Sequence, residues 1–456
     1  MKKTLRFLFV TLLLLIASTQ GVFAQWYEIT EEKYDASGKM LYCIYNYKSI
    51  DEKGEEIILS SYMQCGSSGI VMDGTSTDQL HQIVLLHHYT IYDNSKCPTQ
   101  QKYNLLDAAT LLDKLVIAPD YQGFGVSKDR LQMYMIHELC GRQNFDALEA
   151  GKKIFDDMSN LSLKEDWTLA LAGASQGASN TIATHRYMTQ NNLCDSWRLS
   201  ASVVCDGPYC PAKMLEALFD QEKYGKLYLP MAMVIAVKAM MTAYPDIFVG
   251  YEEKDFYTEE FAVLMPQINA AVAARDESLD ALEDTLTNKK AVPYDIHKLF
   301  CADLFEKDSA KRIVMMKALD KCDVTSGWIA SQPIKGWDYP EDDVVPHVNS
   351  EILKDAFGDM VTLDDPSAGI NIAHAILQMA TRHQTACGGF LAAASILGLV
   401  GINVKGMDDY INASTTGIDN IYFYQPDMIR YDLNGRQVDQ NYRGFIIVGG
   451  KLKLAQ

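Results

Sequence analysis

Short, continuous apolar segments recur along the first half of the chain. They are Gln82–Leu86, Lys114–Ala118, Trp167–Ala172 and Ser200–Val204. Such segments are typical of strands that are buried on both faces of a sheet. A helical pattern, Phe145–Phe155, lies between the second and third of them. This alternation predicts right-handed βαβ units and an α/β fold, with a mostly parallel sheet and helices on both faces.

An alternating pattern precedes these segments. Met40–Tyr47 and Ile57–Met63 are rich in aromatic and β-branched residues, and the turn signal Asp51–Gly54 separates them. We therefore expect an antiparallel hairpin at the start of the sheet.

Helical periodicity dominates from about residue 211 to 322. Its most apolar part, Leu229–Tyr244, is rich in Met, contains Lys238 and is bracketed by Pro230 and Pro245. These features favour a buried or lid helix over a membrane span. The block is expected to be a helical cap inserted over the sheet.

Strand-like patterns resume near Pro333–Tyr339 and Ala375–Thr381, and the composition changes again from about Ile421. In that last part, Asn434-Gly435 and Gly449-Gly450 separate β-rich segments, which predicts hairpins. We expect an α/β core in two parts, 25–210 and 323–405, around the cap at 211–322. A small β tail is expected at 421–456.

The N-terminus has the pattern of a secretory signal peptide. Three basic residues, Lys2, Lys3 and Arg6, precede the apolar run Phe7–Ala17, and Val22-Phe23-Ala24 resembles a cleavage site. The apolar run is shorter than the ~20 residues that span a bilayer. We expect residues 1–24 to be removed and the mature chain, with no transmembrane span, to be secreted, periplasmic or at the cell surface.

The charge and the cysteines limit the classes of partner. A formal charge of −18 makes nucleic acid or an anionic membrane surface a poor partner. The ten cysteines show no paired CxxC spacing, so no metal site is predicted from them. Cys205 and Cys210 are near enough in sequence to form a disulfide, although the spacing does not establish one.

The strongest chemical signal is Gly173-Ala174-Ser175-Gln176-Gly177. It follows a predicted strand and precedes the helix-compatible Ala178–Met188. A G-x-S-x-G sequence in this setting forms a sharp turn that projects the serine Oγ from the sheet, and Gly173 and Gly177 permit the close approach of helix and strand. Ser175 is the predicted nucleophile; Ser179, one helical step further, is the less favoured serine.

A serine nucleophile needs a base and an acid, which follow it in chain order in this arrangement. Asp342, after the strand Pro333–Tyr339, is the preferred acid, with Asp343 next. His383 is the preferred base because it leaves the apolar run Ala375–Thr381. His374 enters that run, and His347 lies too close to Asp342 in sequence.

An oxyanion hole is expected from backbone N–H groups. Gln176 lies at the start of a helix, and Tyr89 or Thr90 follow the strand Gln82–Leu86. The adjacent His87 and His88 have no carboxylate or Cys at ligand spacing. No metal or organic cofactor is expected.

With these residues, the chain resembles the secretory lipase-like branch of the α/β-hydrolases over about residues 40–400. The likeness rests on the Ser175 turn, on the segments 118–127 and 206–209, and on Asp342-Asp343-Val344-Val345-Pro346. It implies the family's catalytic triad, with Asp342 as acid, and a cap that shapes the acyl pocket. His88-Tyr89-Thr90 departs from the family's His-Gly-Thr-like loop. The strand before the acid usually ends in a His-Ser or His-Gly pair in this family, whereas here it reads Trp337-Asp338-Tyr339. These departures leave room for a substrate other than a simple lipid.

The tail resembles the C-terminal sorting modules of proteins exported by type IX secretion. The likeness rests on Tyr431–Arg436 and Gly444–Lys451. It implies a secretion machinery as a partner; an ordinary terminal hairpin is the alternative.

The sequence thus predicts a secreted serine esterase or lipase-like enzyme that acts on a small-molecule or lipid ester through an acyl-enzyme. One alternative is a serine peptidase, in which Glu252, Glu253 or Asp255 of the cap would hold a peptide terminus. The other is a non-catalytic surface-binding protein with the same fold.

Overall fold

The computed structural model describes residues 26–34, 36, 38–65, 79–102, 114–220, 225–377, 379 and 381–396, together with four strands between residues 430 and 455. The predicted signal peptide, residues 1–24, lies outside the described residues. Residues 1–401 and 402–456 form two compact units.

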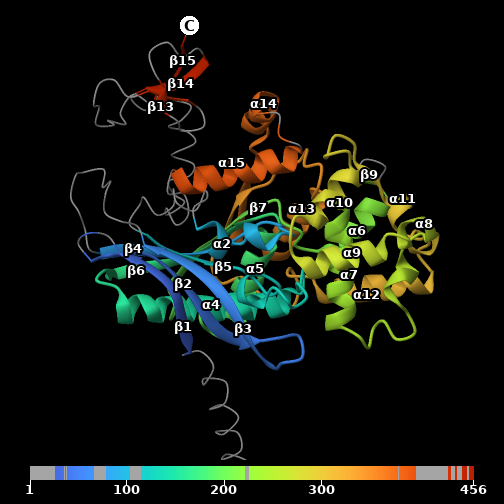
Figure 1. Cartoon of the computed structure of the whole chain (residues 1–456), viewed down its shortest axis with the longest axis horizontal. Coiled ribbons are helices and arrows are strands. Elements are labelled where there is room, and N and C mark those ends of the chain that lie inside the picture. Colours follow the sequence, from blue (N-terminus) through green and yellow to red (C-terminus); the bar gives the residue numbers. More distant parts are fainter. Residues whose placement is uncertain are drawn as a thin grey trace, which may run out of the picture. The chain divides into compact units, whose positions relative to one another are not determined.

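A nine-stranded sheet organises the described part of the first unit (Figure 1). Its order is β1-β2-β3-β5-β4-β6-β7-β10-β11. The strands are β1 (Tyr27–Tyr34), β2 (Met40–Ile50), β3 (Glu56–Cys65), β4 (Gln79–His87), β5 (Lys114–Pro119), β6 (Ser162–Ala174), β7 (Leu199–Cys205), β10 (Ile334–Trp337) and β11 (Val361–Asp364). β1, β2 and β3 are antiparallel, as is the β3–β5 pair, whereas all pairs from β5 to β11 are parallel. The predicted hairpin and parallel sheet are confirmed.

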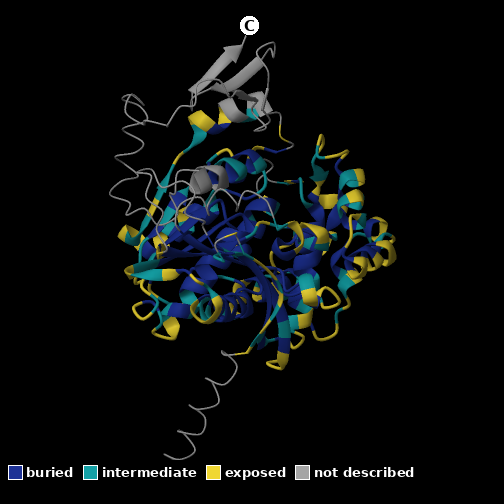
Figure 2. Ribbon diagram, turned by 60° about the vertical axis from the view of Figure 1, so that its left-hand side comes forward, coloured by how far each residue is buried: buried dark blue, intermediate teal, exposed yellow. Residues whose placement is uncertain are grey.

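Successive residues of a strand point to opposite faces of the sheet. Both faces of this sheet are apolar, and helices cover both of them. From β6, Leu169 and Leu171 pack with Phe145 of α4 (His137–Met158) on one face. Ala170 and Ala172 pack with Phe390 of α15 (Arg382–Ile396) on the other. On the first face, α5 (Gln176–Gln190) and α13 (Val348–Phe357) pack over β7 and β10. In Figure 2 the middle of the sheet is coloured as buried, whereas its edge strand β1 is intermediate or exposed.

The block between the two sheet-building parts is helical and has its own apolar core. It comprises α6 (Pro211–Asp220), α7 (Pro230–Ala243), α8 (Glu259–Ala262), α9 (Met265–Ala274), α10 (Ser278–Leu286), α11 (Ile296–Leu299) and α12 (Ala310–Lys321), with the short strands β8 (Lys226–Leu227) and β9 (Tyr294–Asp295). The apolar α7 is largely buried inside this block. Among the described helices none is both long and apolar enough to cross a membrane.

The remaining helical turns are short. They are η2 (Asn94–Lys96), α2 (Pro98–Gln101), η3 (Gly125–Ser127), η4 (Glu253–Phe256), η5 (Ala302–Leu304) and η6 (Gly358–Met360).

The C-terminal unit contains a four-stranded antiparallel sheet of order β13-β12-β14-β15. Its strands are β12 (Arg430–Asp432), β13 (Gln437–Val438), β14 (Gly444–Val448) and β15 (Lys451–Ala455). The predicted β tail is therefore present.

One predicted strand is wrong. Residues 375–377, placed at the start of a strand, instead end α14 (Ser367–Leu377). The helix has a clear start signal, since the Asp365 carboxylate accepts a hydrogen bond from the Ser367 N–H (2.8 Å) and Pro366 precedes the first helical residue. The last strand of the described sheet is β11, whose side chains are intermediate or exposed and therefore form no apolar segment in the sequence.

Candidate active site

Ser175 occupies the sharp turn between β6 and α5. Its backbone has φ +57° and ψ −126°, a region that L-residues rarely adopt. The Ser175 N–H donates to the carbonyl of Cys205 (2.9 Å), which ties the turn to β7. Backbone strain of this kind persists where the surrounding structure holds it, and it is frequent at functional sites.

The flanking glycines allow this turn to form. A Cβ on Gly173 would lie 2.4 Å from the carbonyl carbon of Gly177, and a Cβ on Gly177 would lie 2.2 Å from the carbonyl oxygen of His87. Both obstacles are backbone atoms, so only glycine fits either position without a shift of the strand or helix.

We expect Gly177→Ala to destabilise the fold by about 1–3 kcal/mol or more, as overpacking does in tight cores. A thermal melt should show a midpoint lowered by about 2–4 °C per kcal/mol. Gly369→Ala is the matched control, because nothing lies within 4 Å of its added Cβ. An unchanged midpoint for Gly177→Ala would contradict the close packing at this turn.

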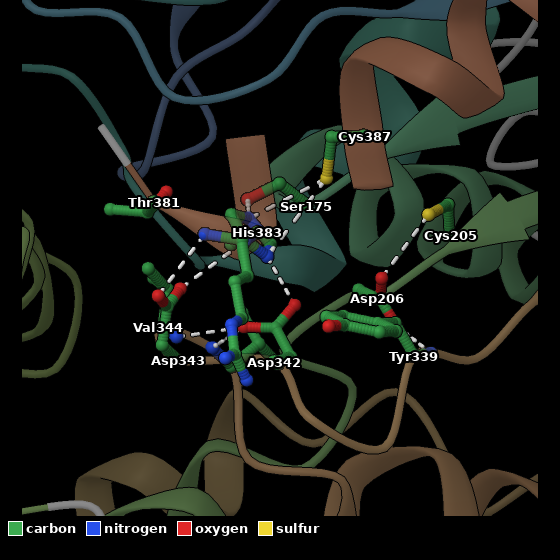
Figure 3. A network of polar contacts seen from close by, with 12 residues as sticks. Ser175, Cys205, Asp206, Tyr339, Asp342, Asp343, Val344, Thr381, His383 and Cys387 are labelled. Atoms are coloured by element: carbon green, nitrogen blue, oxygen red, sulfur yellow. Dashed lines mark hydrogen bonds and ion pairs between the residues drawn. The ribbon is translucent and has the colours of Figure 1, made fainter. Parts of the chain in front are cut away.

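A chain of hydrogen bonds joins Ser175, His383 and Asp342 (Figure 3). His383 Nε2 lies 2.8 Å from Ser175 Oγ, and His383 Nδ1 lies 2.5 Å from Asp342 Oδ2. A carboxylate only accepts, so Nδ1 carries a proton and a neutral imidazole leaves Nε2 free to accept from the serine. All three side chains are buried.

Backbone groups hold Asp342 in place. Its Oδ1 accepts hydrogen bonds from the N–H groups of Val344 (2.7 Å) and Val345 (2.8 Å), in the loop that follows β10. Its neighbour Asp343 accepts from the N–H groups of Arg382 (3.1 Å) and His383 (3.2 Å) at the start of α15. Asp343 therefore anchors the helix that carries His383 rather than contacting the imidazole.

The other candidate histidines have different partners. His347 contacts Asp338 (2.9 Å), and His374 contacts the hydroxyl of Thr385 (3.0 Å). The other candidate serine, Ser179, donates to the carbonyl of Gln176 (2.9 Å). The structure brings Ser175, Asp342 and His383 together, and it does not bring these alternatives into the same chain of hydrogen bonds.

A cavity of about 410 Å³ opens over this arrangement. Ser175 and His383 line it, as do Tyr89 and Thr90, the two residues expected to supply an oxyanion donor. Gln176, the other expected donor, is the first residue of α5 and is itself buried. Further lining comes from Ile91, Tyr92, Lys96, Leu229, Asp280, Glu283, Lys290, Met379, Gln384, Cys387 and Gly388. The cavity therefore lies between the sheet and the helical block.

Solved structures share this architecture. A rice cell wall degrading esterase, LipA from Xanthomonas oryzae, aligns with a TM-score of 0.64 at 16% identity, over 82% of this chain and 97% of that one. A Legionella pneumophila protein assigned as a hydrolase aligns with a TM-score of 0.57 at 18% identity, over 75% and 91% of the two chains. Candida antarctica lipase A aligns with a TM-score of 0.53 at 13% identity, over 83% and 90%. No protein-family model and no curated protein sequence matches the chain.

The chain has the α/β-hydrolase fold. The site lies at the carboxyl ends of the parallel strands, since Ser175 follows β6 and Asp342 follows β10. Open α/β sheets generally place their sites at this edge.

Within this α/β-hydrolase fold, His87 and His88 have structural contacts. His87 lies near the carbonyl of Ala172 (3.2 Å) and the hydroxyls of Thr181 and Thr184. His88 contacts the carbonyl of Asp120 (3.1 Å). Burial lowers the pKa of His87 to about 3 and that of His88 to about 4, so both rings are neutral. Among the described residues, the ligand atoms that lie close enough together to hold a metal ion belong to Asp206, Asp342 and His383.

The acidic cap residues considered for peptide binding do not line the Ser175 cavity. Glu253 pairs with Lys238 (2.5 Å), while Glu252 and Asp255 cap η4. The carboxylates that do line the cavity, Asp280 and Glu283, contact Lys96 (2.7 Å) and Lys290 (3.7 Å).

All ten cysteines are free, so the possible Cys205–Cys210 disulfide does not form. Cys205 instead donates to the Asp206 carboxylate (3.3 Å) at the end of β7.

Two site residues, Asp206 and Cys387, were not predicted as such. Asp206 lies beside the Asp342–His383 pair and is discussed below. Cys387 Sγ lies 3.6 Å from His383 Nε2 and 3.9 Å from Nδ1. Because the sulfur is nearly equidistant from both ring nitrogens, it does not lie along the Nε2 lone pair, which points toward Ser175. The i,i+4 spacing of Cys387 from His383 on a helix was the available signal.

Proposed function

We propose that this protein is a serine hydrolase that cleaves carboxylic esters through an acyl-enzyme. The observation that carries the proposal is the Ser175–His383–Asp342 hydrogen-bond chain, in which Ser175 lies on a strained turn and, with His383, lines a cavity. A serine becomes a nucleophile when a neighbouring base accepts its proton and a third group orients that base.

In this proposal, Ser175 Oγ attacks the ester carbonyl while His383 Nε2 takes its proton. His383 then donates that proton to the departing alcohol, and a water molecule repeats the sequence to release the acid. Asp342 keeps the proton on Nδ1 and stabilises the imidazolium. The N–H group of Gln176, with that of Tyr89 or Thr90, is assigned to the developing oxyanion.

Esters are favoured over peptides by two considerations. The structural neighbours include an esterase and a lipase. In addition, the two carboxylates in the cavity wall each have a lysine partner and are not left free for a peptide α-ammonium group.

The test compares p-nitrophenyl acetate, butyrate and octanoate with aminoacyl p-nitroanilides on the purified mature chain. We expect turnover of at least one ester and none of the anilides. Turnover of the anilides alone would favour the peptidase. No turnover, with no covalent labelling by a fluorophosphonate, would favour the non-catalytic binding protein.

The pH dependence should reflect His383. Burial is the largest single effect on the pKa of His383 and lowers it, but the charges and hydrogen bonds of Asp342 and Cys387 together raise this pKa well above 6.5. Only neutral His383 can accept the serine proton, so kcat/KM should increase with pH, with a midpoint above about 6.5. Asp342→Asn should move this midpoint to lower pH. A wild-type midpoint well below 6 would contradict the close His383–Asp342 pair.

The same shift has a consequence for stability. The pKa of His383 is higher in the folded state than in the unfolded state. The contribution of His383 to the free energy of unfolding is therefore complete below the unfolded-state pKa and is lost as the pH rises through the folded-state pKa.

We also propose that the protein is exported, with residues 1–24 as signal peptide and the tail as a sorting module. Support comes from the sequence pattern of both segments. Expression of the full chain in a type IX-competent host tests this: we expect a mature N-terminus at Gln25, and retention inside the cell when residues 421–456 are deleted.

A further inference from the structure

A second carboxyl group lies beside the Asp342–His383 pair. Asp206 directly follows β7 and is only 3% exposed. One oxygen of Asp206, one of Asp342 and a ring nitrogen of His383 all lie within 4.8 Å of one another. The proposed mechanism uses two of these groups and leaves Asp206 without a role.

Asp206 connects two strand ends at the site (Figure 3). Its Oδ1 accepts a hydrogen bond from the N–H of Tyr339 (2.9 Å), and the carbonyl of Tyr339 accepts from the N–H of Asp342 (3.0 Å). Asp206 therefore holds the first residue of the turn that carries Asp342. No other side-chain contact with the Tyr339 N–H is present among the described residues.

The backbone at Asp206 is also unusual. Its φ of +45° lies in the left-handed region, which costs a non-glycine residue on the order of 1 kcal/mol. Such a conformation persists where the position of the side chain is needed.

The two neighbouring carboxyl groups have different partners. Asp342 accepts hydrogen bonds from two backbone N–H groups and from the imidazole of His383. Burial, and then the charge of Asp342, raise the pKa of Asp206 well above its ordinary value. The other titratable groups that interact with Asp206 are Cys205, Tyr209, Cys387 and His383.

We propose that Asp206 is a positioning residue, which accepts the hydrogen bond of the Tyr339 N–H and thereby fixes the turn that carries Asp342. This inference rests on the proposed function for its kinetic effect, but its structural part concerns only the His383–Asp342 hydrogen bond.

The test compares Asp206→Ala with Asp206→Asn. Alanine removes the acceptor for the Tyr339 N–H, so the Asp342 turn shifts, and we expect kcat to fall by about 10–100-fold with little change in KM. Asparagine is neutral and keeps the acceptor oxygen, so it should recover most of this loss and preserve the pH midpoint of kcat/KM. Full activity of Asp206→Ala would overturn the positioning role. An Asp206→Asn variant as impaired as Asp206→Ala, or with its pH midpoint lowered by about one unit, would show that the site needs the charge of Asp206 and not its hydrogen bond to Tyr339, which would also overturn the positioning role.

A second measurement does not depend on activity. The Nδ1 proton shared by His383 and Asp342 should give a far-downfield proton NMR resonance that is lost in Asp342→Asn. We expect it to remain in Asp206→Asn and to weaken or shift in Asp206→Ala; an unchanged resonance in folded Asp206→Ala would contradict the inference. If wild type shows this resonance but hydrolyses no ester, the proposed function fails and the positioning role is still decided.

Discussion

Ser175→Ala is expected to lower kcat for ester hydrolysis by about 10⁴–10⁶-fold, the range seen when a triad nucleophile is removed from other serine hydrolases. The loss is large because no other hydroxyl in the described residues is hydrogen-bonded to His383 Nε2. Alanine fits the buried turn without new contacts, so the thermal midpoint should change little. Initial rates with the preferred p-nitrophenyl ester provide the measurement.

Ser179→Ala is the matched control. Ser179 is buried one helical turn further along α5, and its hydroxyl donates to the carbonyl of Gln176. Removing one such neutral hydrogen bond costs about 0.5–1.5 kcal/mol of stability and no catalytic group, so kcat should stay within a few-fold of wild type. If Ser179→Ala were the inactive variant and Ser175→Ala the active one, the assignment of the nucleophile would be wrong.

Asp342→Asn is expected to reduce kcat by about 10⁴-fold, as this change does in the serine protease triad. The asparagine oxygen can still accept from Val344 and Val345, so the loop should persist. What disappears is the charge that holds the proton on Nδ1 and stabilises the imidazolium. The rate is measured with the same ester.

Asp343→Asn separates the two neighbouring acids. Asp343 binds the first N–H groups of α15, so its amide replacement should weaken a helix cap by about 1 kcal/mol and lower kcat about 10-fold or less. A larger loss for Asp343→Asn than for Asp342→Asn would reverse the roles assigned to these residues.

Much of the fold could be predicted because its central strands are continuous apolar segments separated by clear helical patterns. β4, β5, β6 and β7 each match a predicted segment, since strands buried on both faces need apolar residues on both sides. β11 was missed because four residues with intermediate or exposed side chains carry no pattern. The last strand was instead predicted at Ala375–Thr381. Its first three residues end the helix α14, which begins beside the Asp365 carboxylate.

The candidate site could be predicted in part for a similar reason. The turn at Ser175 imposes glycine at two positions, and this constraint is visible in the sequence. His383 was selected because it follows the strand predicted at Ala375–Thr381, which the structure does not contain. The selected residue agrees with the observed geometry, but the reason for selecting it was wrong. Asp206 could not be selected, because its role depends on the pairing of β7 with β10 and on a hydrogen bond across 133 residues of sequence.

The nucleophile assigned to Ser175 is tested most directly by covalent labelling of the intact protein with a fluorophosphonate, followed by peptide mass spectrometry. We expect one adduct, on Ser175, which forms in wild type, is absent from Ser175→Ala and is strongly slowed in Asp342→Asn. A folded wild-type protein that stays unlabelled, or that is labelled at a residue other than Ser175, would contradict this assignment.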